Sequence, residues 1–325
     1  MSMTETIKLY DRDAYATEFE ADIISCEPNK ADDKQFDIIL NQTLFFPEEG
    51  GQSPDMGILG GFRVVDVQIK NGVITHTVDI SAGDCCIMGK EEAQTEKKTD
   101  GQIIGMECAS EKAELAAGVH VHGKIDWQHR FYNMQQHSGE HIFSGIVHRR
   151  FGFENVGFHL SDSVVTMDFS GVISPEDIAE VEHEVNVAIS KNIPIEVTYP
   201  SRDELAQMEY RSKIEIEGQV RIVTVPGYDV CACCAPHVKR TGEIGMLKVM
   251  NYQNYKGGVR ISILCGFRAL EAFRQKCDII SELMGIFTTN QEAIVDNVTK
   301  LKAVNQSLKS ELGTAKSALM DYKVA

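Results

Sequence analysis

The N-terminal part of the chain carries short runs that are apolar or alternate between apolar and polar residues, a pattern typical of half-buried strands. Asn71-Gly72 separates two of these runs, and this dipeptide is typical of a two-residue hairpin turn. Because long helical patterns are missing here, residues 1–126 are expected to form a small β-barrel or sandwich. The runs lie at 36–40, 62–69, 73–78 and 119–125.

From about residue 127 the pattern indicates helices as well as strands. Apolar residues between 142 and 146 follow helical spacing and predict a helix over 134–151. Ser174-Pro175 predicts the start of a second helix, which runs to about residue 190, because serine is a good N-cap and proline suits the first turn. Residues 127–265 are therefore expected to be an α+β domain with helices on an antiparallel sheet. Its strands are expected at 163–169, 195–199, 220–225, 248–252 and 259–264.

Residues 266–325 are expected to be helical. From residue 294 the apolar positions alternate at spacings of four and three, which is the pattern of a coiled-coil seam. One polar residue in the seam, Asn305, is of the kind that fixes register. The helix either packs as an amphipathic helix on its own chain or, as the regular seam favours, pairs with another helix, in cis or as a dimer. A homodimer through this helix is one such pairing. The end of the chain suggests a further C-terminal domain beyond it. The seam consists of Ile294, Val298, Leu301, Asn305, Leu308, Leu312, Ala315 and Leu319.

Composition narrows the classes of protein that the chain can belong to. At 325 residues it is long enough for two or three domains, and its net charge of −16 argues against a general nucleic-acid binder, although a local basic patch still permits RNA binding. No apolar run of about 18 residues predicts a membrane span, and the first residues do not read as a signal peptide. The nine cysteines are odd in number and partly adjacent, which favours a reducing cytoplasm over a disulfide framework.

Two short motifs predict one metal site. His137 and His141 are four residues apart, so a helix places both rings on one face. Cys233 and His237 have the same spacing in a stretch that contains a proline. Three imidazoles and one thiolate are a suitable tetrahedral zinc shell. If one ligand moves away or water displaces it, such a metal can activate that water for hydrolysis.

The identity of the sulfur ligand is open, because Cys231 and Cys234 lie beside Cys233 and either could replace it. Gln136 and Glu140 are expected to support the ligands rather than bind metal.

A polar loop with two glycines lies within the N-terminal domain, at residues 45–57. The Gly50-Gly51 pair permits close backbone approach to a ligand, and Gln52 and Asp55 make the loop polar enough to bind one. No Gly-Lys-Ser/Thr follows, so the loop is not a phosphate-binding loop. A plain connection between strands is the alternative interpretation.

These three motifs, in this order, resemble those of the free-standing alanyl-tRNA editing proteins, which are similar to the editing domain of alanyl-tRNA synthetase. The motifs are Phe46-Pro-Glu-Glu-Gly-Gly-Gln52, His137-Ser-Gly-Glu-His141 and Cys233-Cys-Ala-Pro-His237. The resemblance covers about residues 5–265. It departs from the usual pattern at Glu49, where a third glycine is common, and in the second motif, where Cys-Gly-Gly-Thr-His is frequent.

The resemblance implies an N-terminal β-barrel and a central editing domain. It implies zinc held by His137, His141, Cys233 and His237, and hydrolysis of the ester that joins serine, or secondly glycine, to tRNA(Ala). The mischarged tRNA(Ala) is then the partner.

In this scheme His137, His141 and Gln52 are catalytic, while Thr43, Gly50, Gly51 and Gln52 bind the substrate. The hydroxyl of Thr43 is expected to recognise serine, because a site built to pair a hydroxyl rejects a substrate that lacks it. Zinc either activates water or holds the substrate amino group.

Two other functions fit part of the sequence. His137-Ser-Gly-Glu-His141 is also an inverted zinc-protease motif with Glu140 as the base, but that interpretation leaves Cys233 and His237 unexplained. A structural zinc module with a coiled-coil tail for a partner is the non-enzymatic alternative, and a closed shell of four protein ligands would favour it.

Overall fold

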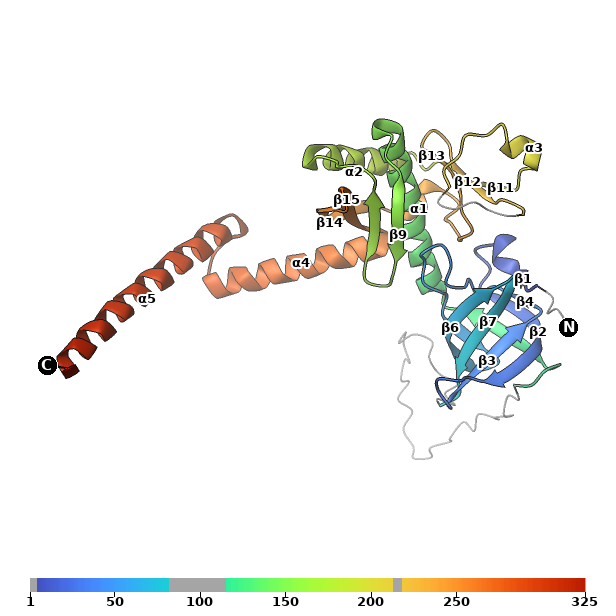
Figure 1. Cartoon of the computed structure of the whole chain (residues 1–325), viewed down its shortest axis with the longest axis horizontal. Helices are drawn as coiled ribbons and strands as arrows, with labels where there is room; N and C mark the ends of the chain where they lie inside the picture. The colour runs from blue at the N-terminus through green and yellow to red at the C-terminus, as the bar shows by residue number, and fades with distance from the viewer. Residues whose placement is uncertain (1–4, 82–114, 213–217, 325) are drawn as a thin grey trace, which may run out of the picture. The chain divides into compact units, whose positions relative to one another are not determined.

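The computed structural model describes residues 5–81, 115–212 and 218–324. The chain divides into two compact units, Met1–Phe267 and Arg268–Ala325. The first unit contains a ring of strands, a helix-covered sheet and a smaller sheet, and the second contains long helices (Figure 1). The expected mixture of helices and antiparallel sheets, with a long helix at the C-terminus, is confirmed.

Six antiparallel strands of the first unit close into a barrel in the order β2-β3-β7-β6-β5-β8. The predicted hairpin is confirmed, because β6 and β7 pair up to Lys70 and Val73. Asn71 and Gly72 both have positive φ, at 51° and 77°, as a type I′ turn requires. The barrel strands are β2 (Glu18–Pro28), β3 (Gln35–Leu40), β5 (Gly57–Leu59), β6 (Phe62–Lys70), β7 (Val73–Asp79) and β8 (His120–Ile125).

The barrel interior is filled by alternate residues of its strands. Along β7, Ile74, His76 and Val78 are completely buried, and the neighbouring positions are partly exposed. A short parallel pair, β1 (Ile7–Lys8) with β4 (Gln42–Thr43), lies beside the barrel and is followed by the buried residues 44–47. The glycine-rich loop therefore starts from a rigid base.

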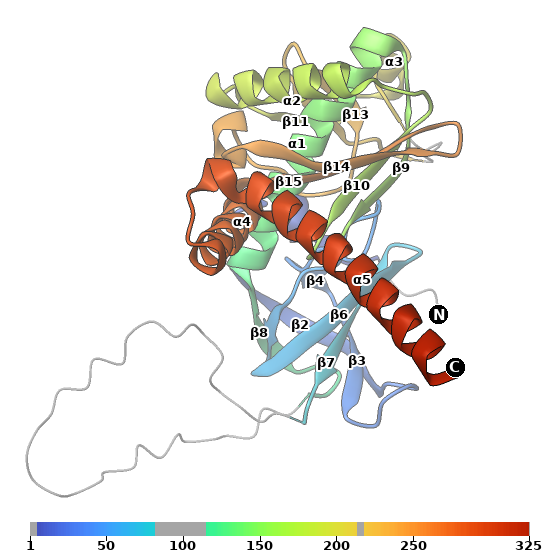
Figure 2. The same cartoon turned by 90° about the vertical axis from the view of Figure 1, so that its left-hand side faces the viewer.

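A long helix, α1 (Trp127–Phe151), packs against the central four-stranded sheet. The sheet has the order β14-β15-β10-β9, and α2 (Pro175–Ser190) packs against α1 (Figures 1 and 2). Ser174 caps α2 with its side chain, as predicted. The sheet strands are β9 (Asn155–Leu160), β10 (Val165–Phe169), β14 (Leu247–Tyr255) and β15 (Gly258–Cys265).

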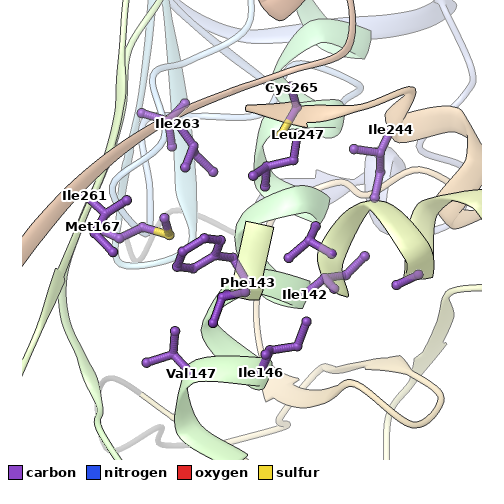
Figure 3. Close-up of a cluster of buried hydrophobic side chains, with 14 of the residues drawn as sticks. Ile142, Phe143, Ile146, Val147, Met167, Ile244, Leu247, Ile261, Ile263 and Cys265 are labelled. Atoms are coloured by element: carbon purple, nitrogen blue, oxygen red, sulfur yellow. The ribbon is translucent and has the colours of Figure 1, made fainter. Parts of the chain in front are cut away.

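The apolar side of α1 contributes to the main hydrophobic core of this layer. Side chains from the helix, from β10 and from the β14–β15 hairpin interlock there, and they are almost completely buried. Figure 3 shows this cluster, which includes Ile142, Phe143, Met167, Ile244, Leu247 and Ile263.

The helix starts earlier than the apolar pattern predicts. The side chain of Asp126 accepts a hydrogen bond from the backbone of His129, so the helix begins at Trp127 rather than near residue 134. Much of α1 is buried yet polar, so the first turns of the helix lack the apolar periodicity from which a helix is predicted. The buried polar side chains are Arg130, Asn133, Gln135, Gln136, His137, Ser138, Glu140, His141 and Ser144.

The remaining strands of the first unit form a second, smaller sheet. The order is β11-β12-β13, with β11 (Glu196–Thr198), β12 (Ile222–Val225) and β13 (Asp229–Ala232). β11 and β12 lie where strands were predicted, whereas β13 was not predicted. One sheet around the second motif was expected, and the structure has two. The backbone after β13 carries Cys233, so this small sheet places the second motif. The short helices of the unit are η1 (Leu9–Asp11), α3 (Arg202–Leu205) and η2 (Thr241–Ile244).

The second unit consists of helices joined by a short connection at residues 288–290. It holds most of α4 (Gly266–Phe287), then η3 (Gln291–Ala293) and α5 (Ile294–Val324). The predicted helix after residue 294 is confirmed. Several of its seam leucines are more than half exposed, and pairing through them stays a prediction. Among the helices of the described residues, none combines the length and the apolarity needed to cross a bilayer.

One fully buried ion pair joins the glycine-rich loop to α1. Arg130 of α1 donates two hydrogen bonds from Nε, at 3.0 and 2.9 Å, and one from Nη2 to the carboxylate of Asp55. It also donates to the carbonyl oxygens of Ala14 and Leu44, while Asp55 accepts from the backbone of Phe46 at 2.7 Å. Both side chains are completely buried, so each charge depends on the other.

We expect Arg130→Met to lower the free energy of unfolding by about 3–5 kcal/mol, because it leaves the Asp55 carboxylate buried without a cation. Arg150→Met is the matched control, since the pair of Arg150 with Glu180 is partly exposed and should contribute at most about 1 kcal/mol. Urea denaturation measures both values. Equal losses in the two variants would contradict a special role for the buried pair.

Candidate metal centre

The four predicted ligands come together beside the barrel. Within α1 the four-residue spacing places the rings of His137 and His141 on one face, with centroids 5.3 Å apart. The segment after β13 brings His237 to within 4.9 Å of the first ring and 4.5 Å of the second. The ring and thiol atoms that could bind a metal lie within 4.8 Å of one another, and the group includes Cys233.

The separations within this group suit zinc. The Sγ of Cys233 lies 3.5 Å from Nε2 of His137 and 3.4 Å from Nε2 of His237. Zinc–nitrogen bonds of about 2.0–2.1 Å and zinc–sulfur bonds of about 2.3 Å, set at tetrahedral angles, place neighbouring ligand atoms about 3.3–3.6 Å apart. These two Sγ–Nε2 separations match neighbouring ligand atoms of a tetrahedral zinc ion, and the ligand atom of His141 lies within 4.8 Å of the others.

Each histidine of the group has a hydrogen-bond partner on its other ring nitrogen. The Nδ1 of His137 lies 2.7 Å from Oε1 of Gln52, and the Nδ1 of His141 lies 2.9 Å from Asp229. The Nδ1 of His237 lies 3.0 Å from the hydroxyl of Ser138. Such partners fix the ring orientation and leave Nε2 for a metal.

These partners differ from those expected from the sequence. Gln136 bonds the backbone of Cys265 with both amide atoms, and Glu140 accepts hydrogen bonds from Ser144 and Asn155. Both residues therefore hold α1 to its neighbours rather than orient the histidines. The partners Ser138 and Asp229 were missed, although each lies within or just before a ligand motif.

Asp229 is itself held by a second charged group. Arg211 donates to both carboxylate oxygens, at 2.7 and 2.9 Å. Burial acts to raise the pKa of Asp229, but its bonds with His141 and Arg211 lower it by more, so the pKa lies below its usual value. Asp229 is thus a fixed carboxylate behind His141.

The three neighbouring cysteines have different electrostatic surroundings. Burial acts to raise the pKa of Cys233, but His137 and His237 lower it by more, so the pKa is well below that of an ordinary thiol. Burial raises the pKa of Cys231 to about 11, and burial together with Cys233 raises that of Cys234. Cys231 lies with His141 and Asp229 in a second group of potential ligands, but as a protonated thiol at neutral pH. Of the three, Cys233 lies within the four-residue group and has the lowered pKa, which favours it as the sulfur ligand.

The glycine-rich loop reaches this site through a tight turn. The backbones of Glu49 and Gln52 pair with each other, at 3.1 and 3.3 Å, around Gly50 and Gly51. Both glycines have positive φ, at 64° and 85°. A Cβ on Gly51 would lie 2.4 Å from the carbonyl oxygen of Phe158, so only glycine allows this approach to β9.

Contact with β9 fixes the position of Gln52. Gln52 forms a parallel bridge with Leu160, whose backbone donates to the carbonyl of Gly51 at 2.7 Å. The Gln52 side chain is completely buried and bonds His137. The loop therefore places a residue of the barrel domain beside the four predicted ligands. These four residues, His137, His141, Cys233 and His237, are called the metal group below.

Thr43 is placed differently from the other predicted substrate residues. Its side chain is completely buried, and its hydroxyl lies 2.8 Å from Nε2 of His76 and accepts from the backbone of Phe45. The Nδ1 of His76 lies 3.1 Å from the carbonyl of Ile38, so this nitrogen carries the proton and Nε2 accepts from Thr43. Burial lowers the pKa of His76 to about 4, which keeps the ring neutral. The Thr43 proton is thus already engaged inside the barrel.

Known proteins resemble the chain over nearly its whole length. Residues 220–262, which include Cys233 and His237, match the family described as the threonyl and alanyl tRNA synthetase second additional domain. Alanyl-tRNA editing protein AlaX-L of Pyrococcus horikoshii is 25% identical over 97% of this chain and 72% of its own length. The chain is related to alanyl-tRNA editing proteins.

Two further relatives show how the similarity is distributed. Alanyl-tRNA editing protein Aarsd1 of Danio rerio is 27% identical over 93% of this chain and 69% of its own length. The alanine–tRNA ligase of Ignicoccus hospitalis is 26% identical over 98% of this chain but only 32% of its own length. The chain therefore corresponds to one part of the ligase and to most of each free-standing relative.

We predict that iodoacetamide modifies Cys233 of the metal-free protein near pH 7 far faster than Cys234. Both side chains are partly exposed, but only Cys233 has a lowered pKa and hence a thiolate at that pH. Peptide mass spectrometry after short exposure measures the two rates, and added zinc should protect Cys233. Preferential labelling of Cys234 would assign the sulfur ligand to that residue instead.

A second prediction concerns Gly51. Gly51→Ala should lower the free energy of unfolding by about 1–3 kcal/mol more than Gly61→Ala, because its methyl group meets the Phe158 carbonyl. Gly61 is a matched control, since its φ of 86° is nearly the same and a Cβ there meets nothing within 4 Å. Thermal unfolding of both variants gives the difference. If the two variants lose the same stability, the close approach to β9 has no energetic importance.

Proposed function

We propose that the protein is a hydrolase that removes serine, and secondarily glycine, from mischarged tRNA(Ala). One observation carries the proposal: three segments that are far apart in the chain meet at one place. Gln52 comes from the glycine-rich loop, His137 and His141 from α1, and Cys233 and His237 from the segment after β13. A relative named as an alanyl-tRNA editing protein is similar over 97% of this chain, so the similarity spans all three of these segments. The substrate is then the ester between the wrong amino acid and the tRNA.

The residues of the group fit zinc as the metal, with His137, His141, Cys233 and His237 as ligands. When bound there, zinc supplies Lewis acidity beside the ester that is cleaved. The chain itself contributes the orientation of the rings, since Gln52 holds one ring and Asp229 another. The thiolate of Cys233 offsets one positive charge of the ion.

Gln52 is placed to act on the substrate as well as on a ligand. Its Oε1 accepts from His137, and its buried Nε2 has no partner within the described part of the chain. A fixed donor of this kind stabilises the negative charge that develops on an ester carbonyl oxygen during hydrolysis. Because the donor is already buried and oriented, no reorganisation is needed when the charge appears.

A structural zinc module is the second candidate function. The observation that favours it is that four protein side chains surround the proposed ion, which is the arrangement of closed structural sites. In that case zinc would stabilise the fold and exchange slowly, and no ester would be hydrolysed. The unpaired Nε2 of Gln52 argues for the hydrolase, because a purely structural site would leave this buried donor without a purpose.

We also propose how the chain is divided into domains and how its tail assembles. We assign residues 1–126 to the barrel with the substrate loop, 127–265 to the editing domain and 266–325 to a helical tail. The tail pairs with a second copy through the seam that contains Asn305 and the exposed leucines of α5. The reaction takes place in the cytoplasm, where charged tRNA is used.

Hydrolysis of seryl-tRNA(Ala), with alanyl-tRNA(Ala) as the comparison, tests the function. We expect rapid release of serine while alanine is spared, and loss of this activity in His137→Ala and Cys233→Ala. Ser138→Ala should weaken zinc binding by about 10- to 100-fold, because it removes the ring partner of His237, together with the acceptor of the Val238 backbone N–H, and leaves all four proposed ligands in place. Cys277→Ala, which changes an exposed cysteine of α4, serves as the control. Zinc retention without any release of serine would support the structural module.

A further inference from the structure

Three buried polar atoms near the metal group have no hydrogen-bond partner within the described residues. They are the hydroxyl of Tyr10, Oε2 of Glu49 and Nε2 of Gln52. Tyr10 is 2% exposed and Gln52 is completely buried, so bulk water does not satisfy them. Buried polar atoms are nearly always paired, and an unpaired group points to a partner from outside the chain. The three atoms therefore indicate a polar subsite.

The turn geometry places Glu49 and Gln52 on one side of the loop. Their backbones exchange both hydrogen bonds, N–H of each to C=O of the other, at 3.3 and 3.1 Å. Residues that pair in this way carry their side chains on the same face, about 5.5 Å apart at Cα. Because Gln52 bonds the proposed ligand His137, the side chain of Glu49 lies on the face of the turn that carries this contact.

A second contact supports this placement of Glu49. Its carboxylate lies close enough to the thiol of Cys234, which directly follows the proposed ligand Cys233, to raise the pKa of that thiol. A Cβ built on Gly50 would lie 3.6 Å from the same sulfur. The turn and the second metal motif are thus in direct contact, and Glu49 lies where they meet.

The charge of this subsite indicates its ligand. Across the described residues, the ion pairs of the protein do not include Glu49, although the carboxylate oxygen Oε2 is buried. A buried carboxylate without a cation is costly, so a cationic donor is the complementary ligand. Gln52 offers the opposite group, an unpaired donor that suits a carbonyl oxygen. An aminoacyl ester carries both groups, an α-ammonium and a carbonyl, on adjacent carbon atoms.

We propose that Glu49 binds the α-ammonium group of the aminoacyl ester, while Nε2 of Gln52 holds its carbonyl oxygen beside the metal group. This inference rests on the proposed function, and it assigns recognition of the free amino group to a residue of the barrel loop. The two contacts fix the ester at both ends of the bond between Cα and the carbonyl carbon. They thereby orient the carbonyl for attack by water.

The test compares seryl-tRNA(Ala) with N-acetylseryl-tRNA(Ala), which has no ammonium group. The wild-type protein should hydrolyse the free amine with a kcat/KM about 10- to 100-fold higher, as expected for loss of one charge-assisted hydrogen bond. Glu49→Gln should lose this preference by slowing only the reaction of the free amine. Glu49→Asp keeps the charge and should recover part of the preference.

Glu48→Gln is the matched control. Glu48 has the same side chain one position earlier but is exposed and bonds Gln68, so its variant should retain the wild-type preference. Zinc content is measured in every variant, and Glu49→Gln should keep its zinc. The inference is overturned if Glu49→Gln slows both substrates equally, or if it behaves like Glu48→Gln. If the wild-type protein hydrolyses neither ester, the proposed function itself fails, and this assignment fails with it.

Discussion

The buried ion pair of Arg130 and Asp55 is the constraint on which the site depends. It joins the two segments that must meet, because Arg130 lies two turns before His137 on α1 and Asp55 lies three residues after Gln52. The guanidinium also bonds the carbonyl of Leu44, at the start of the loop. Neither charge can separate from the other without a large desolvation cost. The barrel loop is thus fixed at its beginning and end against the helix that carries the first ligands.

The metal group shows the same dependence on distant contacts. Its three histidines are oriented by residues from three different parts of the chain. These are Gln52 from the glycine-rich loop, Ser138 from α1 and Asp229 from β13. Such outer contacts decide which ring nitrogen is available and hold the ring in place. The lowered pKa of Cys233 follows from the same packing, because the rings of His137 and His237 surround its sulfur.

Polar burial has two different purposes in this protein. In α1, residues such as Gln136 and Glu140 are fully paired, so they specify how the helix packs. In the glycine-rich loop, Glu49 and Gln52 each retain an unpaired buried atom within the described residues. The paired groups stabilise the scaffold, and the unpaired ones are available to a ligand. Thr43 is one of the paired buried groups, since its hydroxyl forms a hydrogen bond with His76.

The sequence by itself determined the features that depend on local patterns. Alternation identified the strands of the barrel around Asn71-Gly72, and the four-residue spacing of His137 and His141 identified one predicted ligand pair, because both follow from the periodicity of one element. The equal spacing of Cys233 and His237 lies in a segment without regular structure. Only the tertiary structure decided that the strands of residues 155–265 separate into two sheets. It also decided that Asp229 and Ser138 contact the rings of His141 and His237, and that Cys233 has a lowered pKa while its cysteine neighbours do not. These features arise from contacts between residues far apart in the chain, and burial and neighbouring charge, rather than local sequence, set their chemistry.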